Sequence, residues 1–156
     1  MKKYEFTGET KTVFGVTLNR IRALVKIELG WHTVQIGELG GWIEKDSNLS
    51  HEGNAWVCGD ARVCGDARVC DDALVCGDAW VCKMTHYVVM GPMGSRNAFT
   101  TFMRCADDVI KVRCGCFFGT IDEFLAKVKE THGDSKHAKV YRAAVEVAKA
   151  QIELCE

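Results

Sequence analysis

Proline, net charge and long apolar runs are all scarce in this chain of 156 residues, and each scarcity excludes a class of protein. Twenty lysines and arginines against 21 aspartates and glutamates leave a formal net charge of −1, which excludes a broad basic footprint for nucleic acid. No apolar run approaches the ~20 residues of a membrane-spanning helix, and the N-terminus MKKYEFTGET lacks the apolar stretch of a signal peptide. We therefore expect a cytoplasmic globular protein that binds neither membranes nor nucleic acid.

The nine cysteines do not show the pattern of a disulfide framework. Five of them recur every six residues within a repeat, and the total is odd in a chain without a secretion signal, so we interpret them as reduced thiols. The spacing C-x5-C is not a zinc-ligand spacing, and Cys114-Gly115-Cys116 lacks a second close pair. We expect no metal and no cofactor, and a structural role for Cys114 and Cys116.

Residues 57–82 repeat the six-residue unit Val-Cys-Gly-Asp-Ala-Arg with small changes. A step of six drifts around a helix of 3.6 residues per turn and would scatter the valines over every face, which excludes a helix. In a strand, Ala61 and Val63 face inward, Arg62 and Cys64 face outward, and glycine with aspartate forms the next bend. The single proline of the chain agrees with strands that all donate hydrogen bonds to a neighbour.

This repeat resembles the left-handed parallel β-helix of hexapeptide-repeat proteins, in which three hexads complete one coil. The resemblance implies that residues 18 apart stack at about 4.8 Å. Cys58 would then lie over Cys76, Trp56 near Leu74, and two further pairs would be Cys64 over Cys82 and Arg62 beside Trp80. The stacking distance lies within the Cα range of disulfides, although we favour thiols that simply pack on the surface.

Five clear hexads complete fewer than two coils, so the repeat must extend or be covered. Degenerate hexads at Ile43 and Leu49 extend it, with an irregular corner at 52–54. We predict a mainly β fold with a C-terminal α+β part: a short left-handed parallel β-helix (hexapeptide solenoid) over residues 43–83, a β-rich N-terminal cap over 1–42, and a ββαα module over 84–156. The open ends of the solenoid also predict a homo-oligomer, either a dimer or a trimer.

The two flanks contain ordinary strand and helix signals. Thr120 followed by Glu123 is a capping box at the start of a helix that ends at Gly133. A second helix is expected from about residue 135 to 154. Alternating apolar residues predict strands over 4–6, 18–24, 31–36, 86–90, 98–105 and 109–114.

The whole organisation resembles proteins encoded by phages and prophages of gut and Firmicute bacteria. Three stretches carry the resemblance: the entry Gly40-Gly-Trp-Ile-Glu44 with its following residues, the hexad array, and a tail with Gly94-Ser-Arg-Asn97, Cys114-Gly-Cys-Phe-Phe-Gly-Thr120 and His132-Gly133. The family is mainly uncharacterised, so the resemblance implies an infected or lysogenic bacterial host and little about activity. Similar arrays carry tyrosine or serine where this chain has cysteine.

The stretch Ser95-Arg96-Asn97 is the most ligand-like of the sequence. A glycine-led turn presents backbone N–H groups, and the guanidinium of Arg96 suits a phosphate or carboxylate. Arg104 and Arg113 on the following strands would extend a basic face toward an anionic ligand such as a nucleotide. The alternative is structural: Arg96 pairs with Asp107 or Asp108, and the alternation is that of any solvent-facing strand.

Two functions follow from these patterns. The first is a non-enzymatic phage-type binding protein that counters bacterial anti-phage defence, by binding a host defence protein or by sequestering a small nucleotide signal. The alternative is a hexapeptide-repeat acyltransferase-like enzyme with His51 as its base, but no neighbouring residue marks His51 for that role, and we assign no catalytic residue. The regular aspartates of the hexads suit corner capping better than mimicry of nucleic-acid phosphates.

Overall fold

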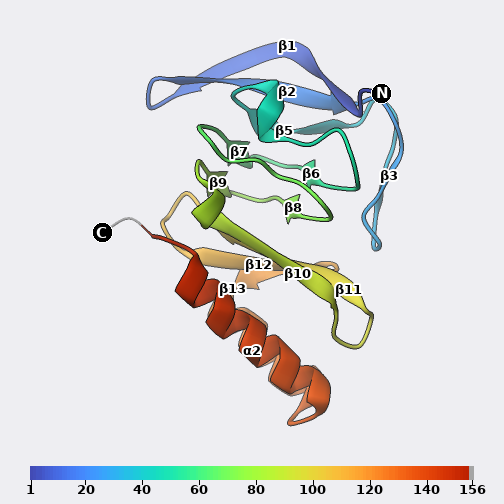
Figure 1. Cartoon of the computed structure of the whole chain (residues 1–156), viewed down its shortest axis with the longest axis vertical. Coiled ribbons are helices and arrows are strands. Elements are labelled where there is room, and N and C mark those ends of the chain that lie inside the picture. Colours follow the sequence, from blue (N-terminus) through green and yellow to red (C-terminus); the bar gives the residue numbers. More distant parts are fainter. Residues whose placement is uncertain (155–156) are drawn as a thin grey trace.

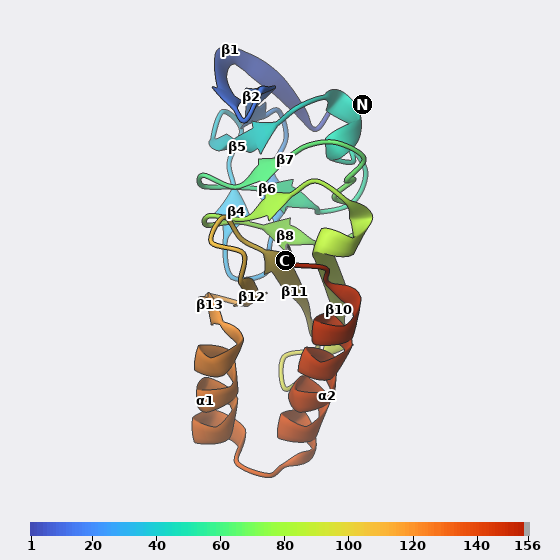
Figure 2. The same cartoon turned by 90° about the vertical axis from the view of Figure 1, so that its left-hand side faces the viewer.

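The computed structural model describes residues 1–154 as an elongated stack of layers (Figure 1). At one end lies a hairpin of β1 (Tyr4–Val13) and β2 (Val16–Ala23), and at the other end lie helices α1 (Ile121–His132) and α2 (Lys136–Gln151) (Figure 2). Short strands from the hexad region and a four-stranded sheet fill the space between them (Figure 2).

The hairpin continues into a five-stranded mixed sheet with the order β1-β2-β5-β7-β9. The pairs β1–β2 and β2–β5 (Leu39–Ile43) are antiparallel, whereas β5–β7 (Arg62–Val63) and β7–β9 (Trp80–Val81) are parallel. A second parallel ladder joins β6 (Trp56–Val57) to β8 (Leu74–Val75). Two 3-10 helices, η1 (Asp46–Asn48) and η2 (Met84–His86), lie at bends of the central region.

The expected stacking of residues 18 apart is confirmed. Arg62 pairs with Trp80 and Trp56 pairs with Leu74, and the guanidinium of Arg62 lies 5.1 Å from the Trp80 ring. The alanines and valines of the hexads are buried, as the alternation predicts, with Ala61 and Val63 fully shielded. In the earlier pairs, Trp42 with Arg62 and Leu49 with Val69, the separation along the sequence exceeds 18 by the two extra residues of the irregular corner.

The fold class expected from the hexads is wrong. Within residues 1–154, the largest sheet is mixed, the C-terminal sheet is antiparallel, and the only purely parallel sheet is the two-residue ladder of β6 and β8; no solenoid or parallel β-helix forms. Each hexad strand is only two residues long, and the repeat covers fewer than two turns of chain, so antiparallel partners extend and cover it on both sides. The chain is therefore a mainly β protein with two C-terminal helices.

Close packing at the entry to the hexads explains its paired glycines. A Cβ on Gly40 would lie 2.7 Å from side-chain atoms of both Ile21 and Trp56, and one on Gly41 would lie 2.7 Å from Val57. The indole of Trp56 is fully buried at this point. The glycines thus let β5 lie directly against β6, and β5 itself crosses the expected boundary between residues 42 and 43.

The C-terminal sheet has the sequential antiparallel order β10-β11-β12-β13. Its strands are β10 (Tyr87–Met93), β11 (Ala98–Arg104), β12 (Ile110–Cys114) and β13 (Phe117–Thr120). Because side chains alternate, Met103 and Phe118 face the central region, whereas Phe102, Val112 and Phe117 face the helices. The sheet therefore separates two apolar clusters.

The capping box of α1 is confirmed, because the Thr120 hydroxyl accepts from the Glu123 N–H at 3.2 Å and the Glu123 carboxylate accepts from the Thr120 N–H at 3.1 Å. Helix α2 ends at Gln151, three residues before the expected end. Neither helix of the described chain has the length and apolar composition that crossing a bilayer would require.

The cysteine stacking is also confirmed, but one thiol pair is oxidised. Cys64 and Cys82 form a disulfide with their Cα atoms 4.5 Å apart, which corrects the expectation of reduced thiols there. Cys64 is not on the surface, because it packs with Leu18 and Trp42 under the N-terminal hairpin. Cys58 and Cys76 remain thiols and share a hydrogen bond.

Candidate functional site

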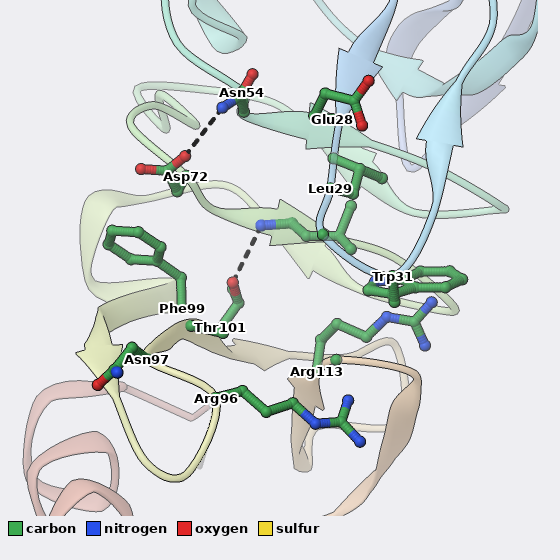
Figure 3. Close-up of a pocket in the computed structure, with 14 residues that line it drawn as sticks. Glu28, Leu29, Trp31, Asn54, Asp72, Arg96, Asn97, Phe99, Thr101 and Arg113 are labelled. Atoms are coloured by element: carbon green, nitrogen blue, oxygen red, sulfur yellow. Dashed lines mark hydrogen bonds between the residues drawn. The ribbon is translucent and has the colours of Figure 1, made fainter.

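A cavity of about 470 Å³, here called the main cavity, lies where three distant segments of the chain meet. The tip of the hairpin formed by β3 (Ile27–Glu28) and β4 (Thr33–Val34) contributes Glu28 and Trp31. The central region and the C-terminal sheet contribute the other walls, which include Asn54, Asp72, Leu74, Arg96, Asn97, Phe99, Thr101 and Arg113 (Figure 3).

The hairpin tip is anchored on both sides. Ile27 and Val34 are buried against the central region, and the hydroxyl of Thr33 donates to the carboxylate of Glu28 at 2.8 Å. These contacts hold Trp31 over the C-terminal sheet. There the guanidinium carbon of Arg113 lies 4.3 Å from the centre of the Trp31 ring, in a cation–π contact.

Arg113 is the most constrained cation of the main cavity. Its guanidinium carbon lies 4.3 Å from the centre of the Trp31 ring and 5.9 Å from that of the Phe118 ring, and within residues 1–154 its shielded Nε–H has no hydrogen-bond partner. A shielded donor without a partner costs about 1–3 kcal/mol of stability, which the packing around Arg113 must offset. Arg113 also acts on the thiol pair: the hydrogen bond from Cys58, aided by the Arg113 charge, lowers the pKa of Cys76.

Arg96 approaches the cavity from the turn between β10 and β11. Its side chain is exposed, and within the described chain it forms none of the ion pairs with Asp107 or Asp108 that the structural alternative required. A Cβ on Gly115 would lie 3.0 Å from Nη1 of Arg96, so the missing side chain at Gly115 leaves room for the guanidinium. Trp31, Arg113 and Arg96 follow one another along one side of the cavity (Figure 3).

Two carboxylates also line the main cavity. Glu28 lies at the hairpin, and Asp72 accepts a hydrogen bond of 3.4 Å from the Asn54 amide. The backbone N–H of Leu74 donates to the Thr101 hydroxyl at 3.0 Å, which ties the central region to the C-terminal sheet at the cavity floor (Figure 3). The cavity can therefore hold a ligand with an anionic end and a hydrogen-bonding end.

The structure brings together three of the five residues expected to bind an anion. Arg96, Asn97 and Arg113 line the main cavity. Ser95 lies next to them in sequence but lines a smaller cavity on the other side of the sheet. Arg104 lies elsewhere: it is buried, donates to the Trp80 carbonyl at 3.1 Å, and stacks on the Trp80 ring at 5.0 Å. Arg104 is thus a structural residue.

The histidine of the acyltransferase alternative is also structural. Nδ1 of His51 accepts the N–H of Lys3 at 3.0 Å, Nε2 lies 2.9 Å from Asp46, and the ring stacks on Tyr4 at 4.2 Å. Although burial opposes it, the hydrogen bond from His51 lowers the pKa of Asp46. Both ring nitrogens are therefore occupied within the protein.

Sequence reasoning missed several residues of the main cavity. The sequence predicts a strand at Trp31 and a bend at Asp72, and nothing in their local sequence marks a site. An aromatic residue directly after Gly30 in a short polar turn was the one available signal, since turns seldom expose a tryptophan. No group of three metal-ligating side chains occurs within residues 1–154.

Comparison with known proteins adds no relative. No protein-family model matches this chain, and the search of curated proteins finds no match.

Proposed function

We propose that the chain is a non-enzymatic binding protein whose main cavity binds a small ligand with a planar ring and an anionic group, the class to which nucleotides belong. One observation carries the proposal: Arg96 and Arg113 converge on one cavity of about 470 Å³ beside Trp31. That volume lies in the range of small-molecule sites, about 300–1,000 Å³.

The resemblance to phage-encoded proteins supplies a biological setting for this proposal. A bacterial defence system that signals through a nucleotide is disabled when that nucleotide is held in a stoichiometric complex. Sequestration needs affinity and abundance rather than chemistry, so a site without a catalytic base is sufficient. The engaged ring of His51 gives the acyltransferase alternative no support.

Calorimetric titration with a panel of nucleoside mono-, di- and triphosphates tests the proposal. We expect at least one of them to bind, and Arg96→Ala to weaken that binding about 10- to 100-fold, since a hydrogen bond to a charged group contributes about 1.5–3 kcal/mol. Arg68→Ala is the matched control, because Arg68 is also exposed but lines neither cavity. Acyl-coenzyme A should bind no more tightly than its nucleotide part binds alone.

An absence of binding across the panel would contradict the proposal. A pull-down from host lysate would then search for a protein target, which is the other form of counter-defence that the sequence suggested. Homo-oligomerisation stays a prediction, and light scattering after size-exclusion chromatography measures it directly.

A further inference from the structure

A second cavity, here called the rear cavity, lies on the helix side of the C-terminal sheet. Its volume is about 170 Å³. Thr100 and Cys114 are paired on β11 and β12 and face the helices, whereas their neighbours Thr101 and Arg113 face the main cavity. Helix α1 supplies Lys127 and Val128, and α2 supplies Tyr141. The two cavities thus lie on opposite faces of the same end of one sheet.

The charges of the two cavities differ. The rear cavity is lined by Arg96 and Lys127 together with His132, and by no carboxylate among the described residues. In the main cavity, two arginines are offset by Glu28 and Asp72. The anionic group of the proposed ligand, which Arg96 can reach from either cavity, is therefore more stable on the rear-cavity side of Arg96, because no carboxylate of the described residues opposes the cations there.

Hydroxyl groups complete an anion-binding environment in the rear cavity. Ser95, Thr100 and Thr131 line it, and the Tyr141 hydroxyl interacts with Ser95 and Cys114. Burial raises the pKa of Tyr141, so its hydroxyl keeps the proton that it donates. A Cβ on Gly94 would collide with the Tyr141 hydroxyl, so the glycine at the turn allows the ring to reach this place.

The two cavities meet at Arg96. Arg96, Ala98 and Gly115 line both of them, and the guanidinium passes over Gly115, where a side chain would obstruct it. The turn that carries Arg96 and the turn at Gly115 close the same end of the sheet. A ligand that contacts Arg96 can therefore extend around this end with one part in each cavity.

We propose that the rear cavity binds the phosphate of a nucleoside phosphate whose ring occupies the main cavity. This inference rests on the proposed function and gives the ligand an orientation. The ring lies near Glu28 and Asp72, whose carboxylates accept hydrogen bonds from amino groups of a base. The phosphate lies between Arg96 and Lys127, with the hydroxyl groups of the rear cavity around it.

Paired titrations test this orientation. The nucleoside phosphate that binds most tightly in the panel and its parent nucleoside are titrated into the wild type, Lys127→Ala and Lys129→Ala. Lys127 and Lys129 are both exposed on α1, but Lys129 lines neither cavity, so it is the matched control. We expect Lys127→Ala to weaken the affinity for the phosphate-bearing ligand about tenfold and to leave the affinity for the nucleoside unchanged. Lys129→Ala should change neither affinity.

Three outcomes separate this inference from the proposed function. Equal binding of the nucleoside phosphate by Lys127→Ala and the wild type, with binding lost in Arg113→Ala, would overturn the orientation and keep the main cavity as the site. A tenfold loss that Lys129→Ala shares would also overturn it, because it would show a general effect of helix charge. Failure of every nucleoside phosphate to bind the wild type would overturn both. Circular dichroism of each variant confirms that the fold is retained.

Discussion

The guanidinium carbon of Arg113 lies 4.3 Å from the centre of the Trp31 ring, and this contact joins the hairpin tip of the N-terminal region to the C-terminal sheet. The two residues come from regions that the sequence assigned to different domains. Their contact closes one wall of the main cavity (Figure 3). The shape of the proposed site therefore depends on a long-range cation–π pair.

A double-mutant cycle measures this pair. We expect Trp31→Ala and Arg113→Ala to show a coupling free energy of about 0.5–1 kcal/mol in urea unfolding, the usual size for an exposed cation–π contact. Arg62→Ala combined with Trp31→Ala is the control, because Arg62 stacks on Trp80 instead. Additive effects of Trp31→Ala and Arg113→Ala would show that the contact contributes nothing to stability.

Asp71 occupies a position where the other hexads have glycine. Its φ is +60°, close to the values of Gly59, Gly65 and Gly77 at the equivalent corners. A side chain in this left-handed region is strained, so we expect Asp71→Gly to stabilise the fold by about 0.5–1 kcal/mol despite the greater freedom of the unfolded glycine. Thermal unfolding measures the change, and Asp66→Gly, at an exposed residue that is not at positive φ, should not stabilise. A lower melting temperature for Asp71→Gly would refute the strain argument.

The disulfide between Cys64 and Cys82 should be visible as a linked peptide in non-reducing mass spectrometry. Its sequence separation is 18, and closing a loop of that size stabilises a fold by roughly 3 kcal/mol. We expect the double variant C64A/C82A to lose about that amount in urea unfolding. The double variant C58A/C76A removes the reduced pair that lies one hexad earlier in the sequence. It should lose less free energy of unfolding, because no covalent link is broken. Equal losses from the two double variants would argue against the bond.

His86 makes stability depend on pH. Its Nδ1 accepts the N–H groups of Cys82 at 2.9 Å and Lys83 at 3.2 Å, which only a neutral ring can do. Burial, with the charges of Arg104 and Lys83, lowers the pKa of His86 from 6.5 to about 4. The unfolded chain therefore binds more protons between these values, so the unfolding free energy is complete above pH 6.5 and falls as the pH falls toward 4, by up to about 3 kcal/mol.

An asparagine at position 86 removes this titration and keeps the acceptor. Asn48 fills the corresponding position of η1, where its amide oxygen accepts the Lys45 N–H at 2.8 Å. We expect His86→Asn to flatten the stability profile between pH 6.5 and 4 while it remains folded at pH 7. A profile as steep as that of the wild type would assign the effect to other groups.

The helices and strands of the C-terminal region follow from local signals. The capping box of Thr120 and Glu123 predicts where α1 begins, because its hydrogen bonds lie within one turn. The alternation in β11 and β12 likewise predicts which side chains share a face. The sequence does not predict strand β13, since its four residues are too few for a clear pattern.

The six-residue period is read directly from the sequence, and with it the burial of Ala61 and Val63 and the pairing of Arg62 with Trp80. Those features depend on spacing along the chain, which the sequence contains directly. Long-range packing, in contrast, extends the hexads into a mixed sheet with antiparallel strands and brings Trp31 to Arg113 beside Arg96. A short turn can be carried to many places by the strands that flank it, and the packing of the whole chain selects one of them.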